Sequence, residues 1–214
     1  MATQHAPRTA SQTAEHLVIQ PSILYFGTPV ALVTTCNRDR TPNIGPMSSA
    51  WALGWTVVQG WETKAHTLEN LERERECVIN VPDPSLWEHV ERLAPLTGRD
   101  PVPEAGRHLF RYEPRKFEAA GLTPAPSETV APPRIQECPL QLEAVVEAVH
   151  TPAGPDGARC RIVETRVQRV HARADIVRPG TNHIDTSRWS PLLYVFRHYF
   201  GTGEELGRTF RAED

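Results

Sequence analysis

Residues 43–49 combine side chains that could bind a flat ligand with polar edges. The stretch holds a glycine, a proline and two serines, where an ordinary strand would show β-branched residues. Gly45 would let a ligand come close, and Pro46, which lacks a backbone donor, would confine the stretch to a sheet edge or a bulge. The hydroxyls of Ser48 and Ser49 and the main-chain groups beside them would then remain available. An irregular edge strand of small residues explains the same pattern, and the stretch alone leaves both interpretations open.

Residues 64–70 could bind a phosphate group. A helix is expected to begin at Thr67, and the N-terminus of a helix offers free amides and a partial positive charge. The Thr67 hydroxyl adds a donor, and Lys64 or His66 adds positive charge. A threonine that only caps the helix is the alternative interpretation of this segment.

The elements that would position these two stretches are mostly strands. Apolar and β-branched runs predict strands at residues 29–36, 53–61, 77–81, 140–148 and 159–174, and capping signals predict helices at 68–76, 84–93 and 114–120. In the strand at 140–148, Leu140 and Leu142 alternate with Gln141 and Glu143, which is the pattern of a strand with one buried face. Strands outnumber helices and the hairpins are sequential. This order favours a mainly antiparallel barrel with helices covering its open ends.

Composition limits the classes of protein to which the chain can belong. The 214 residues are 39% hydrophobic and 23% charged, and the formal net charge is -3. We expect a disordered tail over residues 1–15 and a single domain over 16–214. The sequence has no basic stripe of the kind that binds nucleic acid, no apolar run that would span a membrane and no paired metal-ligand motif. Four widely spaced cysteines favour free thiols in the cytoplasm.

Six segments together resemble the flavin reductase-like domain family. In this sequence they lie at residues 29–35, 41–49, 64–71, 77–82, 117–124 and 137–143. The third resembles the family's Thr-x-x-Asn segment, and the fourth its strand that ends in Asn-x-Pro. The order and spacing of the pieces carry the resemblance, which covers roughly residues 25–200. It implies the FMN-binding split-barrel fold, a mainly β, antiparallel split β-barrel of Greek-key type with a few short flanking helices.

The resemblance also implies a cofactor and a set of residues that bind it. The cofactor would be FMN, with NADH or NADPH as the reductant. The expected cofactor-binding residues are Asn43, Gly45, Pro46, Met47, Ser48, Ser49, Lys64, His66, Thr67 and Asn70. Met47 could lie against a ring face or belong to ordinary core. Tyr199, Phe200 or Arg197 could supply the aromatic or basic residue that the family contributes from its C-terminal region.

Two functional alternatives remain beside an NAD(P)H-dependent flavin reductase. The chain could be a flavin-binding electron carrier without nicotinamide turnover, or a barrel scaffold that has lost the flavin. Since the cofactor carries the hydride chemistry, no catalytic acid or base is assigned. The resemblance further implies a homodimer, with a small-molecule electron acceptor or a partner oxygenase receiving the electrons. The loop at 95–111 is long enough to control access to a binding site.

Overall fold

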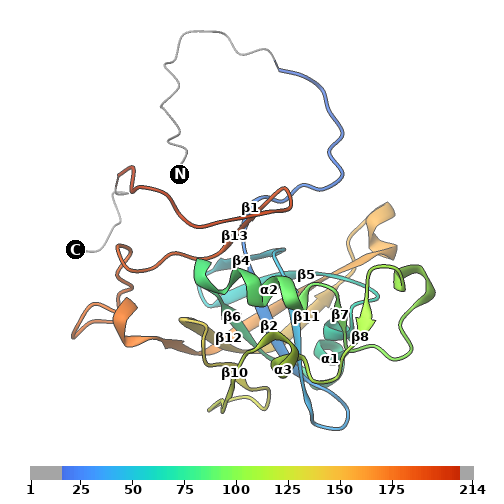
Figure 1. Ribbon diagram of the computed structural model, residues 1–214, viewed down its shortest axis with the longest axis horizontal. Coiled ribbons are helices and arrows are strands. Elements are labelled where there is room, and N and C mark those ends of the chain that lie inside the picture. The colour runs from blue at the N-terminus through green and yellow to red at the C-terminus, as the bar shows by residue number, and fades with distance from the viewer. Residues whose placement is uncertain (1–15, 208–214) are drawn as a thin grey trace.

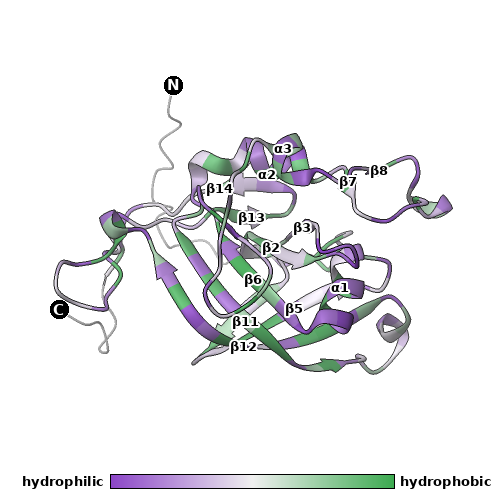
Figure 2. Ribbon diagram, turned by 90° about the horizontal axis from the view of Figure 1, so that it is seen from below, coloured by the Kyte–Doolittle hydropathy of each residue, from purple (hydrophilic) through white to green (hydrophobic). Residues whose placement is uncertain are grey.

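The computed structural model describes residues 16–207, so the tail predicted at residues 1–15 lies outside the described part of the chain. Its main element is a seven-stranded sheet in the order β3-β2-β6-β11-β12-β5-β4, with every neighbouring pair antiparallel. The strands are β2 (Ala31–Cys36), β3 (Pro42–Met47), β4 (Ala50–Leu53), β5 (Thr56–Glu62), β6 (Glu76–Val81), β11 (Leu140–His150) and β12 (Cys160–Ala172). The sheet curls strongly (Figure 2). The predicted mainly β, antiparallel barrel class with a few short helices is confirmed.

Smaller elements surround this sheet (Figure 1). The helices are α1 (His66–Glu74), α2 (Trp87–Leu93) and α3 (Lys116–Ala120), with 3-10 turns η1 (Pro84–Leu86), η2 (Glu104–Gly106), η3 (Pro155–Ala158) and η4 (Ala174–Ile176). Three short sheets are formed by β1 (Phe26–Pro29) with β13 (Leu193–Val195) and β14 (His198–Phe200), by β9 (Pro124–Ala125) with β10 (Arg134–Ile135), and by β7 (Leu96–Thr97) with β8 (Arg111–Tyr112). In the described residues no helix is both long and apolar enough to cross a bilayer.

Strand β2 separates two hydrophobic cores and is buried along its whole length. Successive side chains of a strand point to opposite faces, so Leu32 joins one core while Val33 joins the other. The first core includes Val90 of α2 and Phe117 of α3, and the second includes Leu71 of α1. Cover on both faces explains why this segment shows no alternation of buried and exposed residues and why its two threonines, Thr34 and Thr35, are buried as well.

Two predictions about the strands are wrong in detail. The single strand expected at 53–61 is a hairpin, because the chain turns at Gly54, whose φ of 58° is left-handed, and forms β4 and β5. In the first half of β11, up to Glu143, the buried face is the opposite of the predicted one, whereas Ala144 and Val146 are buried as predicted. Gln141 and Glu143 are buried, whereas the leucines that flank them are only partly buried.

The segment 123–135 explains this reversal in β11, because it covers the strand and supplies polar partners. The carboxylate of Glu143 accepts hydrogen bonds from the backbone amides of Glu128 (2.9 Å) and Thr129 (2.6 Å) and lies 2.7 Å from Nε2 of His171. Burial alone would raise the pKa of Glu143, but the hydrogen bonds outweigh it and bring the pKa to about 2. A fully paired polar side chain can therefore occupy the buried face in place of a leucine.

Candidate functional site

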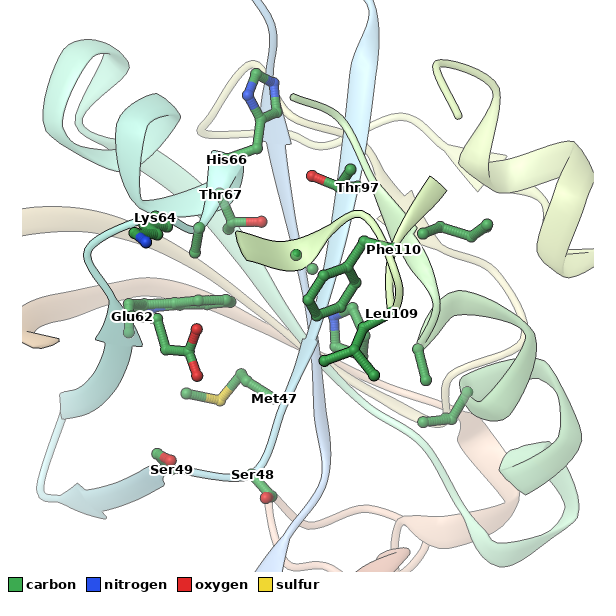
Figure 3. Close-up of a pocket in the computed structure, with 18 of the residues that line it drawn as sticks. Met47, Ser48, Ser49, Glu62, Lys64, His66, Thr67, Thr97, Leu109 and Phe110 are labelled. Carbon is green, nitrogen blue, oxygen red and sulfur yellow. The ribbon is translucent and has the colours of Figure 1, made fainter. Parts of the chain in front are cut away.

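A cavity of about 870 Å³ opens between β3, β5, the N-terminus of α1, the loop that joins β7 to β8, and the β13–β14 hairpin (Figure 3). Eight of the ten residues predicted to bind a cofactor line it: Gly45, Pro46, Met47, Ser48, Ser49, Lys64, His66 and Thr67. Both predicted stretches therefore meet in one hollow, although they come from a strand and a helix that are separate in the chain. Asn43 and Asn70 are not among the residues that line this cavity.

The edge of β3 forms one wall of the cavity. β3 is the terminal strand of the main sheet and pairs with β2 alone, with Gly45 opposite Val33 and Pro46 opposite Leu32. Its other edge faces away from the ladder, which leaves main-chain groups for a ligand. Edge position is also what permits Pro46, which has no donor, to stand in the strand.

Gly45 brings this edge against the start of α1. A Cβ atom at Gly45 would lie 2.2 Å from Oγ1 of Thr67, which is closer than atoms can pack, and 3.1 Å from Cη2 of Trp61, which is a tight contact. Only glycine therefore allows the strand and the helix to approach this closely. The close approach joins the wall formed by β3 to the helix N-terminus.

Helix α1 begins at His66, before the predicted start, and Thr67 does not cap it. The N-cap is Ala65, which has no capping side chain, and Thr67 is the second residue of the helix. Oγ1 of Thr67 instead accepts a hydrogen bond of 3.1 Å from Nδ2 of Asn43. The first amides of α1 therefore lack a side-chain cap at an end that faces the cavity, and such an end favours an anion.

Asn43 and Asn70 form a network behind the cavity wall. Nδ2 of Asn43 donates to Oγ1 of Thr35 at 3.2 Å, and Nδ2 of Asn70 donates to the same oxygen at 3.0 Å. Asn70 also donates to Oδ1 of Asn37 at 3.0 Å. The two asparagines thus fix β3 and α1 relative to each other, which explains why both are buried and neither lines the cavity.

His66 lies where this network meets the cavity. Its Nε2 is 2.8 Å from Oδ1 of Asn37. Burial lowers the pKa of His66, and the nearby cations Lys116 and Arg99 lower it further, against the opposing effect of Glu69. Positive charge around this wall favours a neutral His66 and an anionic ligand.

Lys116 is a residue of the cavity that our sequence analysis missed. It begins α3, is 4% exposed, and donates a hydrogen bond of 2.9 Å from Nζ to the carbonyl of Ile44 on β3. Burial lowers its pKa to about 8. Nothing in its local sequence separates it from a surface lysine of a short helix, because burial follows from the packing of α3 against the edge of β3.

Aromatic side chains form a further wall of the cavity. The ring centroids of Tyr25 and Tyr194 are 5.5 Å apart, as are those of Tyr194 and Tyr199. The hydroxyl of Tyr25 is 2.8 Å from that of Ser49, and Tyr199 donates to Glu91 at 3.0 Å. Of the three C-terminal candidates named from the sequence, Tyr199 and Arg197 line the cavity and Phe200 does not.

The site offers no metal centre within residues 16–207, where no group of three or more histidine, cysteine, aspartate or glutamate side chains is arranged to hold an ion. Its features are a strand edge with free main-chain groups, an uncapped helix N-terminus, two lysines and an aromatic wall. This donor set suits a planar ligand that carries an anionic tail.

Comparison with known proteins relates this arrangement to a family. Residues 23–203 match the family model of the flavin reductase like domain. The chain is 48% identical over 196 residues to the uncharacterized protein YdfE of Bacillus subtilis (strain 168). The alignment covers 91% of this chain and 93% of that protein.

Solved structures share the fold. Flavoredoxin of Desulfovibrio vulgaris (Miyazaki F) aligns with a TM-score of 0.73 at 22% identity, over 93% of this chain and 99% of that one. Nitrilotriacetate monooxygenase component B from Bacillus cereus aligns with a TM-score of 0.73 at 21% identity, over 92% and 100% of the two chains. A putative flavin reductase with a split barrel domain, from Shewanella frigidimarina NCIMB 400, has a TM-score of 0.67 at 19% identity and covers 87% of each chain. The curled sheet is therefore that of a split barrel.

Proposed function

The chain belongs to the flavin reductase like domain family, and on that basis we propose that it is an FMN-binding oxidoreductase. It accepts a hydride from NADH or NADPH and passes the electrons to free flavin or to another acceptor. The observation that carries the proposal is the junction at Gly45, where a free strand edge and an uncapped helix N-terminus meet in one cavity. Flavin proteins among the solved relatives support the choice of cofactor.

The residues present fit the three parts of FMN. The ring edge needs main-chain donors and acceptors, which the outer edge of β3 offers beside Gly45. The ring faces need apolar or aromatic contact, which Met47 and Tyr194 offer from different elements. The phosphate needs concentrated donors and positive charge, which the first turn of α1 offers together with Lys64. Where Gly45 meets Thr67, the cradle is one that any added Cβ would fill.

Lys116 extends this donor set. A lysine ammonium has three N–H donors, and the carbonyl of Ile44 takes one of them. With a pKa of about 8, the amine is mostly protonated at neutral pH. We assign its remaining donors to an electron-rich edge or to the phosphate of the bound cofactor.

The protein's part in the reaction is to bind and orient. When bound, FMN supplies the hydride and electron chemistry. The outer edge of β3 fixes the plane of the flavin ring and α1 fixes the anionic tail. The aromatic wall limits the access of water to the buried side of the ring. His66 is hydrogen-bonded to Asn37 and Tyr199 to Glu91, so both are engaged in holding the walls. We assign no catalytic acid or base.

A homodimer and a partner oxygenase belong to the same proposal. The β4–β5 hairpin exposes three large apolar side chains, Trp51 (58%), Leu53 (75%) and Trp55 (58%), which suits a subunit contact. A relative that is a component of a monooxygenase supports transfer of electrons to a partner oxygenase. Sedimentation equilibrium at micromolar concentration tests the dimer, and a monomer would contradict it. The cytoplasmic location stays a prediction.

Reconstitution tests the cofactor and the reductant in turn. We expect purified protein to take up FMN, with a shifted visible spectrum and altered flavin fluorescence, and to oxidise NADH or NADPH. Protein that fails to bind FMN would overturn the proposal. Stopped-flow reduction separates the reductase from the main alternative, a flavin-binding electron carrier. The likeness to flavoredoxin favours that alternative. Bound FMN that neither nicotinamide reduces would make the protein an electron carrier.

A further inference from the structure

The loop between β7 and β8 forms an apolar wall that the cofactor site does not explain. It spans residues 98–110 and stands out from the body of the molecule beside β3 (Figure 2). The residues that it contributes to the cavity are Val102, Pro103, Ala105, Gly106, Leu109 and Phe110. All six are apolar. Leu109 is 60% exposed and Phe110 is 41% exposed, and Figure 3 shows both side chains reaching over the cavity.

Contacts at the base of the loop and within it hold this wall in place, so the loop does not have to move to form it. Its base is fixed by the pairing of β7 with β8 and by an ion pair of 3.3 Å between Arg99 and Glu69 of α1. Within the loop, the amide of Gly106 donates to Pro103 and the amide of Phe110 donates to Gly106, both at 2.9 Å. A Cβ atom at Gly106 would lie 3.2 Å from Cδ2 of Phe110, so the ring rests against this glycine.

The cavity extends beyond the side of β3 and α1. Its volume of about 870 Å³ is near the upper end of the range of roughly 300–1,000 Å³ for small-molecule sites, and its lining reaches from Gly45 and Thr67 to Leu109 and Phe110. The features that suit FMN lie on the side of β3 and α1. The loop wall therefore faces the space that remains beside a flavin bound there. Apolar side chains that line such a space gain by contact with a ring, and an aromatic side chain gains a stacking interaction in addition to the area that it buries.

We propose that Phe110, supported by Leu109, stacks on the planar heteroaromatic ring of the second ligand and so determines which ligands the site accepts. The ring is that of a nicotinamide or of an aromatic electron acceptor such as free riboflavin. This inference rests on the proposed function, because it takes the flavin to occupy the β3 side. Phe110 is a specificity-determining residue and has no part in the chemistry.

Binding of non-reducing ring ligands tests the inference without turnover. Protein loaded with FMN is titrated by calorimetry with NAD⁺, NADP⁺ and riboflavin. Phe110→Ala should weaken ring binding about tenfold, which corresponds to about 1.4 kcal/mol. Phe110→Trp should keep it within about twofold, and Phe110→Leu should lose much of it although it remains apolar. His108→Ala is the matched control, because His108 is exposed on the same loop and does not line the cavity.

The outcomes distinguish a failure of the inference from a failure of the proposed function. Weakening for the nicotinamides alone assigns the wall to the reductant, weakening for riboflavin alone assigns it to the acceptor, and weakening for both assigns it to both. Normal FMN uptake with unchanged ring binding in Phe110→Ala and Phe110→Leu overturns the inference and leaves the function standing. Failure of the wild-type protein to take up FMN overturns both. Thermal melting of each variant excludes a folding defect.

Discussion

Replacing Lys116 by methionine should make the protein more stable and its cofactor binding weaker. Lys116 is 4% exposed, and burial lowers its pKa from 10.5 to about 8. At about 1.4 kcal/mol for each pKa unit, burying the charged amine costs about 3 kcal/mol of folding free energy. Methionine removes this cost but leaves the carbonyl of Ile44 without its donor, which costs about 1–2 kcal/mol. The net expectation at neutral pH is a gain of about 1–2 kcal/mol.

The gain should depend on pH in a defined direction. The folded pKa of Lys116 is below the unfolded one, so between about pH 8 and 10.5 the unfolded state binds more protons than the folded state. The wild-type protein therefore recovers stability across this window, and its deficit relative to Lys116→Met shrinks. Below about pH 8 both states are protonated and the deficit is complete. Urea unfolding of the FMN-free proteins at about pH 7 and about pH 9.5 measures the difference.

Cofactor binding should change in the opposite sense. Loss of a charge-assisted hydrogen bond costs about 1.5–3 kcal/mol, so FMN should bind at least tenfold more weakly to Lys116→Met, as followed by flavin fluorescence. Arg115→Met is the matched control, since the side chain of Arg115 is 74% exposed next to Lys116 and should affect neither measurement. A variant that is less stable at pH 7, or a stability difference that does not change with pH, would refute the account of a buried charge.

Three further predictions follow from local geometry. Gly45→Ala should destabilise the protein by about 1–3 kcal/mol, and adding Thr67→Ala in the double variant should relieve much of this loss. If the two changes in unfolding free energy, measured by urea unfolding, add within about 0.5 kcal/mol, the contact between residues 45 and 67 is ruled out. Phe196 and Arg197 have left-handed φ angles of 43° and 73°. The double variant Phe196→Asn, Arg197→Gly should therefore raise the melting temperature by a few degrees. A lower melting temperature would show that the two side chains contribute more to stability than the backbone strain costs. Glu143→Gln should cost about 3 kcal/mol of stability at neutral pH and progressively less as the pH falls from 4.5 towards about 2, because the pKa of Glu143 is lower in the folded state than in the unfolded state. Unfolding measured across this pH range checks the prediction. A stability difference between variant and wild type that does not change with pH would contradict it.

The two stretches that meet in the cavity were predictable from the sequence because their chemistry is local. A glycine followed by a proline does not suit an ordinary central strand, so residues 43–49 were expected at a sheet edge or a bulge, and β3 lies at the edge. Charged and hydroxyl side chains before an amphipathic segment likewise indicate the start of a helix, although the alternative interpretation of Thr67 as the helix cap was wrong. That hydroxyl binds Asn43, a residue 24 positions away, and only the folded chain brings the two together.

The identity of the buried polar groups was decided by tertiary packing. Gln141 and Glu143 looked solvent-facing from their alternation with leucines, but the segment 123–135 folds over them and pairs them. Lys116 carries the same local signal as a surface lysine and is buried only because α3 packs against β3.

The second wall of the cavity also came from the structure alone. Residues 98–110 have no periodic pattern, and the pairing of β7 with β8 that directs Phe110 over the cavity joins positions 15 residues apart, Leu96 with Arg111. Sequence by itself thus determined the fold class and the two stretches that meet at the site, since hydrophobic period and turn chemistry act between near neighbours. Which other side chains line that site was decided by contacts between distant segments, which only the folded chain brings together.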